Sequence, residues 1–269
     1  MMSLSEFYKA LNKVENAFVR EQLKKLAQHL EKIEKYMQDK AITKKDAEYM
    51  RRDTWKAIKD FIEEYKVDLG DITRTVYFKA GSQAGAELGA AFRGIPKESL
   101  EWFEKNFLPM QETIMKNYAG DLMRIVENRL AVAIMNGDNI YRVTRDLLKE
   151  IPNSGKRRIT VMVRDQLGRA MQMGIYNTYK VHEDVIKAYK WVGPSDGRTT
   201  KWCRNRKALT AKKPWTPEEI ERYIRKNPKK LGGLEITDPR TGSFLHPHIQ
   251  CRHRLVVVRR SIKAIVKSS

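Results

Sequence analysis

The chain has 269 residues, 41 % of them hydrophobic, which is enough for a buried core and excludes wholesale disorder. Lys and Arg (53) outnumber Asp and Glu (33), and a net charge of +20 indicates a polyanionic partner, either nucleic acid or an anionic surface. No stretch approaches the roughly 18 apolar residues of a membrane span, and the N-terminus lacks a secretory signal, so we expect a cytoplasmic protein with no membrane partner.

The charge is distributed unevenly along the chain. Residues 1–186 hold 32 Lys and Arg against 27 Asp and Glu, whereas residues 187–269 hold 21 against 6. This asymmetry predicts a scaffold of mixed charge followed by a basic functional module.

Apolar side chains recur at three- and four-residue steps in the first half and predict helices. Residues 3–38 form one long amphipathic helix in this interpretation. Thr43 caps a second helix, with Asp46 at the capping-box position, that runs to about Tyr65. Residues 96–136, 139–150 and 156–180 give three more helices, and Pro152 separates the last two.

Gly81, Gly85 and Gly89 recur at four-residue intervals. In a bilayer this spacing is typical of a helix dimerisation face, but charged and amide side chains interrupt it. Close packing between helices outside a membrane is therefore the preferred interpretation.

The pattern changes after residue 184. Residues 185–192 alternate and predict a strand that ends at Gly193 and Pro194, and residues 255–258 predict a second strand. Between them we expect an irregular basic segment with one short helix near 216–225. Because such a segment buries little apolar surface, it needs another source of stability.

Histidines and cysteines cluster in this part of the chain. His246, His248, Cys251 and His253 lie within eight residues, and Cys203 lies 48 positions before Cys251. Thiolate and imidazole are the ligands of structural zinc, so Cys203, His248, Cys251 and His253 form a candidate site, with His246 as the alternative ligand.

Three other interpretations of the cluster remain open. The cysteines can be ordinary buried thiols beside a solvated basic loop, or they can form one disulfide, although a reducing compartment disfavours the bridge. A metal-dependent nuclease would need an open coordination position and a general base, and the acids nearest the cluster in sequence are Asp196 and Asp238. No nucleotide-binding, zincin or serine hydrolase motif occurs, and no catalytic residue is assigned.

Exposed cations in the C-terminal module would bind phosphates without reading sequence. The residues predicted to contact nucleic acid are Arg204, Arg206, Lys207, Lys212, Lys213, Lys229 and Lys230. Trp202, Trp215 and Tyr223 are interleaved with them and can stack on bases, but a role in the small core of the module is preferred.

Three segments, in this order, resemble the phage head morphogenesis domain, the Mu F-like minor head proteins of tailed bacteriophages. They are VRDQLGRAMQMGIYNTY (163–179), KAYKWVGPSDGRTTKWC (187–203) and HPHIQCRH (246–253). The segment before them, RLAVAIMNGDNIYRVTRDLLKEI (129–151), is similar to the family's lead-in of a helix, a Gly turn and a short helix, so the resemblance covers about residues 125–259. Thr200 stands where many relatives have a first cysteine, and His253 replaces their last cysteine. His248 preserves the His-x-x-Cys step of the family and is preferred over His246.

The resemblance implies a minor capsid protein that is not an enzyme. It would associate with the portal protein or other head proteins and with viral double-stranded DNA, in the head interior or at the portal vertex, after assembly in the host cytoplasm. The expected fold is mainly α: a helical docking region (1–124) and a head-morphogenesis domain (125–269) whose small α+β, loop-rich module (185–259) is stabilised by zinc. A zinc-dependent DNA-processing enzyme is the alternative.

Overall fold

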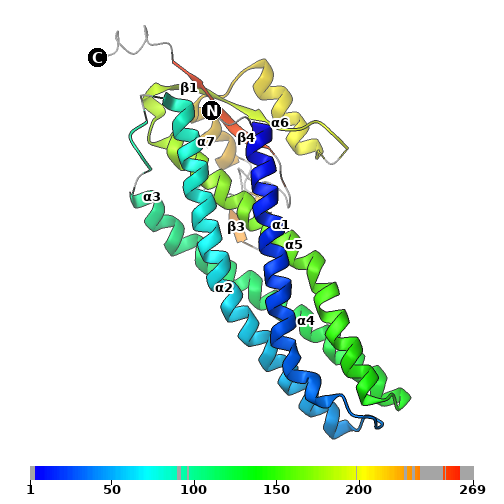
Figure 1. Cartoon of the computed structure of the whole chain (residues 1–269). Coiled ribbons are helices and arrows are strands. Elements are labelled where there is room, and N and C mark those ends of the chain that lie inside the picture. Colours follow the sequence, from blue (N-terminus) through cyan, green and yellow to red (C-terminus); the bar gives the residue numbers. More distant parts are fainter. Residues whose placement is uncertain are drawn as a thin grey trace. The chain divides into compact units, whose positions relative to one another are not determined.

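The computed structural model describes residues 4–89, 92–95, 97–197, 199–226, 229–231, 234–236, 251 and 253–260. The expected fold class is confirmed: long helices fill the first two thirds of the chain, and short strands and helices follow (Figure 1). The elements are α1 (Leu4–Leu30), η1 (Glu31–Tyr36), α2 (Lys44–Leu88), α3 (Lys97–Trp102), η3 (Phe103–Phe107), α4 (Leu108–Asn136), α5 (Ile140–Lys180), η4 (Glu183–Val185), β1 (Ile186–Val192), α6 (Lys201–Lys212), α7 (Pro217–Lys226), β2 (Lys229–Leu231), β3 (Leu234–Ile236) and β4 (Arg254–Arg259).

The chain divides into two compact units. The helical unit comprises Ser3–Asp71 and Leu108–Val163, and the mixed unit comprises Met1–Met2, Ile72–Phe107 and Arg164–Ser269. The divisions fall inside α2 and α5, so each of these helices contributes to both units. The boundary at residue 125 that the family resemblance implies stays a prediction.

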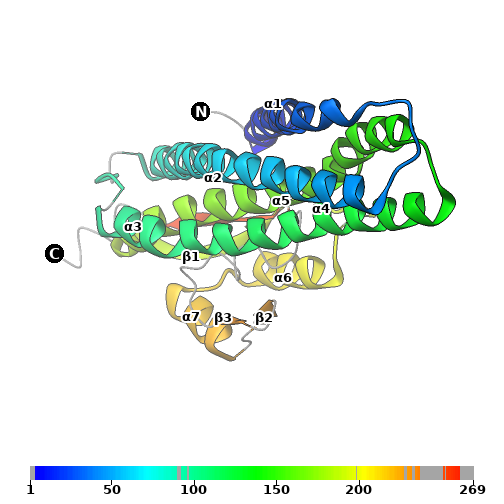
Figure 2. The same ribbon diagram turned by 90° about the horizontal axis from the view of Figure 1, so that it is seen from below.

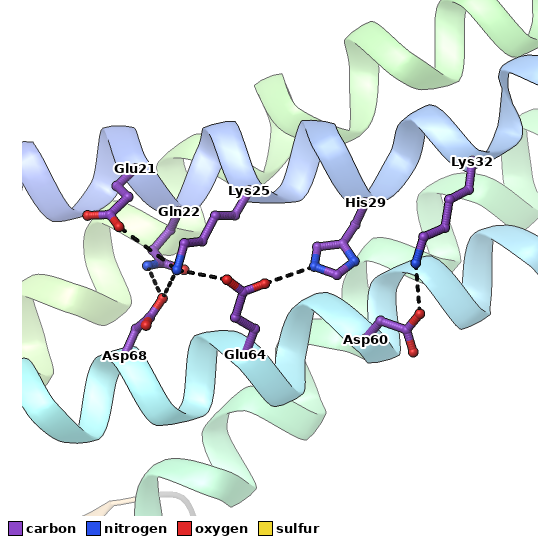
Figure 3. A network of polar contacts seen from close by, with 8 residues as sticks. All are labelled: Glu21, Gln22, Lys25, His29, Lys32, Asp60, Glu64 and Asp68. Carbon is purple, nitrogen blue, oxygen red and sulfur yellow. Dashed lines mark hydrogen bonds and ion pairs between the residues drawn. The ribbon is translucent and has the colours of Figure 1, made fainter.

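In the helical unit, α1 and the first part of α2 lie side by side (Figures 1 and 2). Leu26, Leu30, Phe61 and Tyr65 are buried between the helices of this unit. Charged side chains also join α1 to α2 at the edge of this contact. Lys25 Nζ on α1 lies 2.8 Å from Glu64 and 2.7 Å from Asp68 on α2 (Figure 3). The amphipathic stripe expected in residues 3–38 therefore packs within the unit over much of its length, and α1 ends at Leu30 with η1 after it.

The start of α2 is the predicted capping box. The backbone N–H of Asp46 donates to Thr43 Oγ1 at 3.1 Å, and the backbone N–H of Thr43 donates to Asp46 Oδ2 at 3.1 Å. The predicted end near Tyr65 is wrong, because α2 continues to Leu88. Gly89 ends it in the left-handed region at φ 63°, a backbone conformation that favours glycine.

Close helix packing at the spaced glycines is confirmed for Gly81, which lies in the mixed unit. A Cβ at position 81 would come within 2.9 Å of Thr178 Oγ1 on α5. Gly85 instead accommodates the ring of Phe92, which would lie 2.6 Å from a Cβ at position 85.

The predicted break between residues 150 and 156 is also wrong, because α5 runs unbroken through Pro152. A proline inside a helix costs about 3 kcal/mol, so packing around it must offset this loss. Ile151 and Ile159 are fully buried, and Gly155 lets Tyr118 and Leu26 approach the backbone closely.

The mixed unit contains both predicted strands. β1 and β4 pair antiparallel, with Trp191 opposite Leu255 and Val192 opposite Arg254, and α6 packs beside β1 (Figure 1). The short helix expected near 216–225 is α7, and β2 pairs with β3 antiparallel. The segment after β1 was expected to be irregular, but residues 201–212 form α6.

Among the described residues, no helix combines the length and the apolar character that crossing a membrane requires.

Candidate metal centre

Three elements of the mixed unit meet at the candidate site: the end of β1, the start of α6 and the residues before β4. Because β1 and β4 are antiparallel, the end of β1 and the start of β4 lie together. Gly193 and Pro194 then carry the chain away from the sheet toward α6. This topology brings residues that are 48 positions apart in sequence into contact.

Cys203 lies in the first turn of α6. Thr200 is the N-cap, and its Oγ1 accepts a hydrogen bond from the backbone N–H of Cys203 at 3.3 Å. Thr200, which stands where many relatives of the resembled family have a cysteine, therefore has a capping role here. The cap fixes the turn that points the Cys203 side chain into the module, where it is fully buried.

Cys251 and His253 approach Cys203 from the other side. Cys203 Sγ lies 3.7 Å from Cys251 Sγ, and the ligand atoms of the three residues all lie within 4.8 Å of one another. The distance between the sulfurs excludes a disulfide, in which it would be about 2.05 Å. All three residues are buried, so the group can hold a metal ion away from solvent.

The geometry of this group fits tetrahedral zinc. Zn–S bonds of about 2.3 Å at a tetrahedral angle place two thiolate sulfurs about 3.8 Å apart, close to the 3.7 Å observed. Neither ring nitrogen of His253 has a hydrogen-bond partner among the residues that the structure describes, although the ring is buried. A buried polar nitrogen without a partner is costly, and a metal ion would satisfy one of the two.

Three neighbours fix the position of His253. The Trp191 ring stacks on the imidazole with centroids 6.3 Å apart and planes 6° apart. Gly193 lies against the same ring, because a Cβ at position 193 would be 2.5 Å from its Cδ2 atom. From α5, Gln172 Nε2 donates a hydrogen bond to the backbone carbonyl of His253. The side chain is thus held in place by packing and by an anchored backbone.

A bound metal ion would change the charge state of the Cys251 thiol. A hydrogen bond with the Cys203 thiol, together with burial, raises the pKa of the Cys251 thiol far above its ordinary value. The Cys251 thiol is therefore neutral in the absence of an ion. The positive charge of the Arg206 guanidinium acts against this shift and lowers the pKa of Cys251. A metal ion bound directly to the sulfurs would favour the thiolate form more strongly than Arg206 does.

Residues 196–199 (Asp-Gly-Arg-Thr), part of the second segment of the family resemblance, form a turn. The backbone N–H of Thr199 donates to the Asp196 carbonyl at 2.9 Å, and Thr199 Oγ1 donates to the Pro194 carbonyl at 3.0 Å. These bonds shape the connection between β1 and α6. Of this motif, Arg198 lies outside the described residues.

The structure thus brings together three of the four predicted zinc ligands. His248, and His246 as its alternative, lie outside the described residues. The signal in the sequence was the clustering of cysteine and histidine. The sequence does not assign Trp191, Gly193 or Gln172 to the site. Trp191 and Gln172 belong to segments of the family resemblance, and Gly193 with Pro194 predicts only the end of a strand.

The residues predicted to contact nucleic acid differ in how exposed they are to solvent. Arg204, Lys212 and Lys213 are exposed, and Lys213 pairs with Glu219 at 2.7 Å. Lys207 is half-buried and donates to the Gly193 carbonyl at 2.8 Å and to Ser195 Oγ at 2.7 Å, so it braces the turn after β1. The side chains of Lys229 and Lys230 lie outside the described residues.

Arg206 is placed differently from the prediction. Its side chain is buried, and its guanidinium carbon lies 3.0 Å from the centroid of Trp202 and 5.5 Å from that of Trp191. The prediction that Arg206 contacts nucleic acid is not supported, because a cation between two indoles inside the module stabilises the fold. Trp202 is half-buried and packs edge-on against Trp191, with ring centroids 5.9 Å apart. Trp215 forms an isolated bridge to Tyr189.

Comparison with known proteins gives no match to any family model, any curated protein or any solved structure.

Proposed function

We propose that the chain is a minor head protein of a tailed virus whose C-terminal module folds around one zinc ion. In this proposal it associates with the portal protein or another head component during assembly in the host cytoplasm and stays in the virion beside the packaged DNA. Zinc is held by Cys203, Cys251 and His253, with His248 as the fourth ligand. It supplies folding energy to the module and no chemical step.

One observation carries the proposal: the segments 163–179, 187–203 and 246–253, which resemble the head-morphogenesis family, meet at His253. Gln172 lies in the first segment, Trp191 in the second, and both contact His253 in the third. Cys203, at the end of the second segment, contacts Cys251 in the third. The order of the motifs and their convergence on one site support each other.

The burial of the site supports a structural role over hydrolysis. Cys203, Cys251 and His253 are at most 5 % exposed, whereas a hydrolytic metal needs a position open to water and substrate. The metal-ligand cluster found among the described residues contains no carboxylate that would serve as a general base. Duplex cleavage with added Mg²⁺ or Mn²⁺ that His246→Ala abolishes would favour the alternative, a DNA-processing enzyme.

Particle incorporation tests the head-protein function. The tagged full chain should be found by immunoblot in purified DNA-filled heads of the virus that encodes it, and a chain lacking residues 1–40 should not be. That truncation removes α1 and with it the packing partner of α2 in the helical unit, so retained metal content and circular dichroism must show that the mixed unit is still folded. Absence of the full chain from heads would refute the proposal.

A further inference from the structure

Basic residues of the helical unit differ in whether an acidic partner is present. Where α1 faces α2, Lys25 pairs with Glu64 and Asp68, and Lys32 Nζ lies 3.0 Å from Asp60 (Figure 3). Such pairing largely cancels the field of these cations outside the unit. The exposed side of α5 has a different charge pattern.

Arg142, Lys149 and Lys156 are exposed on α5 at seven-residue steps, and we call them the α5 basic row. A step of seven residues turns a helix by about 20° less than two full turns, so the three side chains share one face. The row spans about 21 Å at 1.5 Å per residue. None of the three forms an ion pair with any other residue in the described ranges.

Neighbouring charges add to this row. Residues 140–163 contain six Lys and Arg against two Asp and Glu. Of those two acids, Asp146 is held by Arg129 at 2.7 Å and lies 3.7 Å from Arg145. Arg158 pairs with Asp121 of α4. Residues 4–36 also carry exposed cations, but there seven Lys and Arg are offset by five Glu. Within the helical unit, α5 therefore presents a concentrated positive face.

We propose that the α5 basic row binds the phosphate backbone of double-stranded nucleic acid without reading its sequence. The proposal deepens the head-protein function proposed above, on which it rests for the biological source of the duplex. It gives the helical unit its own contact with packaged DNA, separate from the basic C-terminal module.

An extended polyanion fits the row better than the other anionic partners. The three cations are spaced about 10 Å apart and do not converge on one small anion, whereas duplex DNA presents about one charge per 1.7 Å of its axis. The apolar face of α5, with Val143, Leu147 and Ile151, is buried, so this helix has no apolar side for a lipid surface. The residues between the cations include the polar Arg145, Asp146 and Asn153, whereas anchors of protein interfaces are mostly aromatic or apolar side chains in buried pockets.

The chain contains a matched control row on α2. Lys45, Arg52 and Lys59 have the same composition and the same seven-residue steps, and all are exposed. They differ because Lys45 and Arg52 lie 5.8 and 5.1 Å from the centroid of the Tyr49 ring, and Lys59 lies 5.0 Å from that of Trp55. Arg52 also pairs with Asp53 at 3.1 Å.

The test compares two triple variants of the full chain, Arg142→Gln/Lys149→Gln/Lys156→Gln and Lys45→Gln/Arg52→Gln/Lys59→Gln. Both lose three positive charges, and glutamine keeps a helix-favouring side chain at each position. Fluorescence anisotropy with labelled duplexes of two unrelated sequences, at several salt concentrations, gives the affinity and its salt slope. Circular dichroism and metal content establish that both variants are folded.

We expect the α5 variant to bind at least tenfold more weakly than the unchanged chain near 0.1 M salt. Its slope of log affinity against log salt should fall by about 3, since each neutralised phosphate contributes about 0.9. The α2 variant should change affinity less than threefold. Equal losses in both variants would show an effect of net charge alone and would overturn the proposal, as would an unchanged affinity of the α5 variant.

Polyglutamate of equal charge distinguishes the partner. If it displaces the duplex from the unchanged chain as well as unlabelled DNA does, the row recognises acidic polymers in general and the nucleic-acid assignment falls. Each of these failures leaves the head-protein function intact, because particle incorporation tests that function separately.

Discussion

The backbone of Gly193 and the imidazole of His253 touch without room for a methyl group between them. A Cβ at position 193 would lie 2.5 Å from Cδ2 and 2.6 Å from Cγ of the ring. Gly193 does not have a positive φ, so this close approach, and not backbone conformation, is the reason for glycine here. The residue therefore controls where the ligand nitrogen lies.

We predict that Gly193→Ala weakens metal binding at least tenfold, which is about 1.4 kcal/mol. The methyl group must push the His253 ring away from its position beside Cys203 and Cys251. Competition with a chromophoric zinc chelator measures the affinity, and the absorption spectrum of the Co²⁺-loaded chain reports the ligand geometry.

Gly197→Ala is the control, since a Cβ at position 197 has no neighbour within 4 Å and the same turn is involved. Its zinc affinity and cobalt spectrum should match those of the unchanged chain. An unaltered spectrum in Gly193→Ala would show that contact with Gly193 does not position the ligand.

Metal removal is expected to unfold the site locally. The purified, reduced chain should contain about one zinc ion, and its loss leaves two buried thiols and a buried imidazole that pack poorly on their own. Hydrogen exchange should then speed up in β1, β4 and the first turn of α6, while amides of α1 and α4 in the helical unit stay protected. A well-folded chain without metal, or uniform loss of protection, would contradict a local structural site.

The convergence of Cys203, Cys251 and His253 was predictable because thiol and imidazole ligands have few other reasons to cluster in a segment poor in apolar residues. The neighbours of the site were not predictable in the same way. Gln172 reaches the His253 carbonyl from α5, and Gly193 is small because of a ring that is 60 positions away. Both roles depend on tertiary contacts that no local pattern encodes.

The helices too could be predicted from the sequence only where local patterns determine them. α6 was missed because residues 201–212 are rich in lysine and arginine, and the residues that the helix buries, Cys203, Arg206 and Thr210, include no large apolar side chain. Its start depends on the Thr200 cap. The unbroken course of α5 could not be predicted, because the local preference of Pro152 is to end a helix and the packing on either side of it that overrides this preference is tertiary. Strands β1 and β4 were found because alternation and apolar runs are local signals.

Gly155 tests the packing that keeps α5 continuous. We predict that Gly155→Ala destabilises the helical unit by about 1–3 kcal/mol through overpacking, because its Cβ would lie 2.7 Å from the buried Tyr118 Oη. Gly120→Ala on α4 meets nothing within 4 Å and should stabilise the chain by about 0.5–1 kcal/mol. Urea denaturation followed by circular dichroism measures both, and equal effects would contradict the packing argument.

Glu87 joins β4 to two helices of the mixed unit. Its carboxylate accepts a hydrogen bond from Tyr179 Oη at 2.6 Å and pairs with the Arg254 guanidinium at 2.9 Å, and Arg254 is buried. We predict that Glu87→Gln costs about 3 kcal/mol, because it leaves a buried charge without its counter-ion. Thermal or urea unfolding measures the loss.

The exposed pair between Arg93 and Asp184 provides the comparison, at 2.6 Å and with both side chains at least 60 % exposed. Asp184→Asn should cost less than about 1 kcal/mol. If both variants lose the same stability, burial does not set the contribution of the Glu87 pair.

Asp53 gives a pH dependence with a defined sign. A hydrogen bond from Lys35, with further ones from Tyr36 and Arg52, lowers the pKa of this carboxyl to about 2. A carboxyl whose pKa is depressed by folding stabilises the folded state above its unfolded pKa of about 3.9, and this contribution disappears as the pH falls toward 2. Because the surrounding cations are largely solvated, we expect only about 0.5–1 kcal/mol.

Asp53→Asn should therefore lower the free energy of unfolding at pH 7, and the difference from the unchanged chain should shrink progressively between pH 4 and pH 2. Urea titrations at pH 7, 5, 4, 3 and 2 follow this difference. Glu31→Gln, a neutralisation at an exposed position of η1, serves as the control for net charge and should change stability by less than 0.5 kcal/mol at pH 7, roughly the range of surface substitutions. If the difference in free energy of unfolding between Asp53→Asn and the unchanged chain grows on acidification, the folded state does not stabilise the charged carboxyl. The ion pair between Asp53 and Lys35 would then have no part in holding η1 against α2.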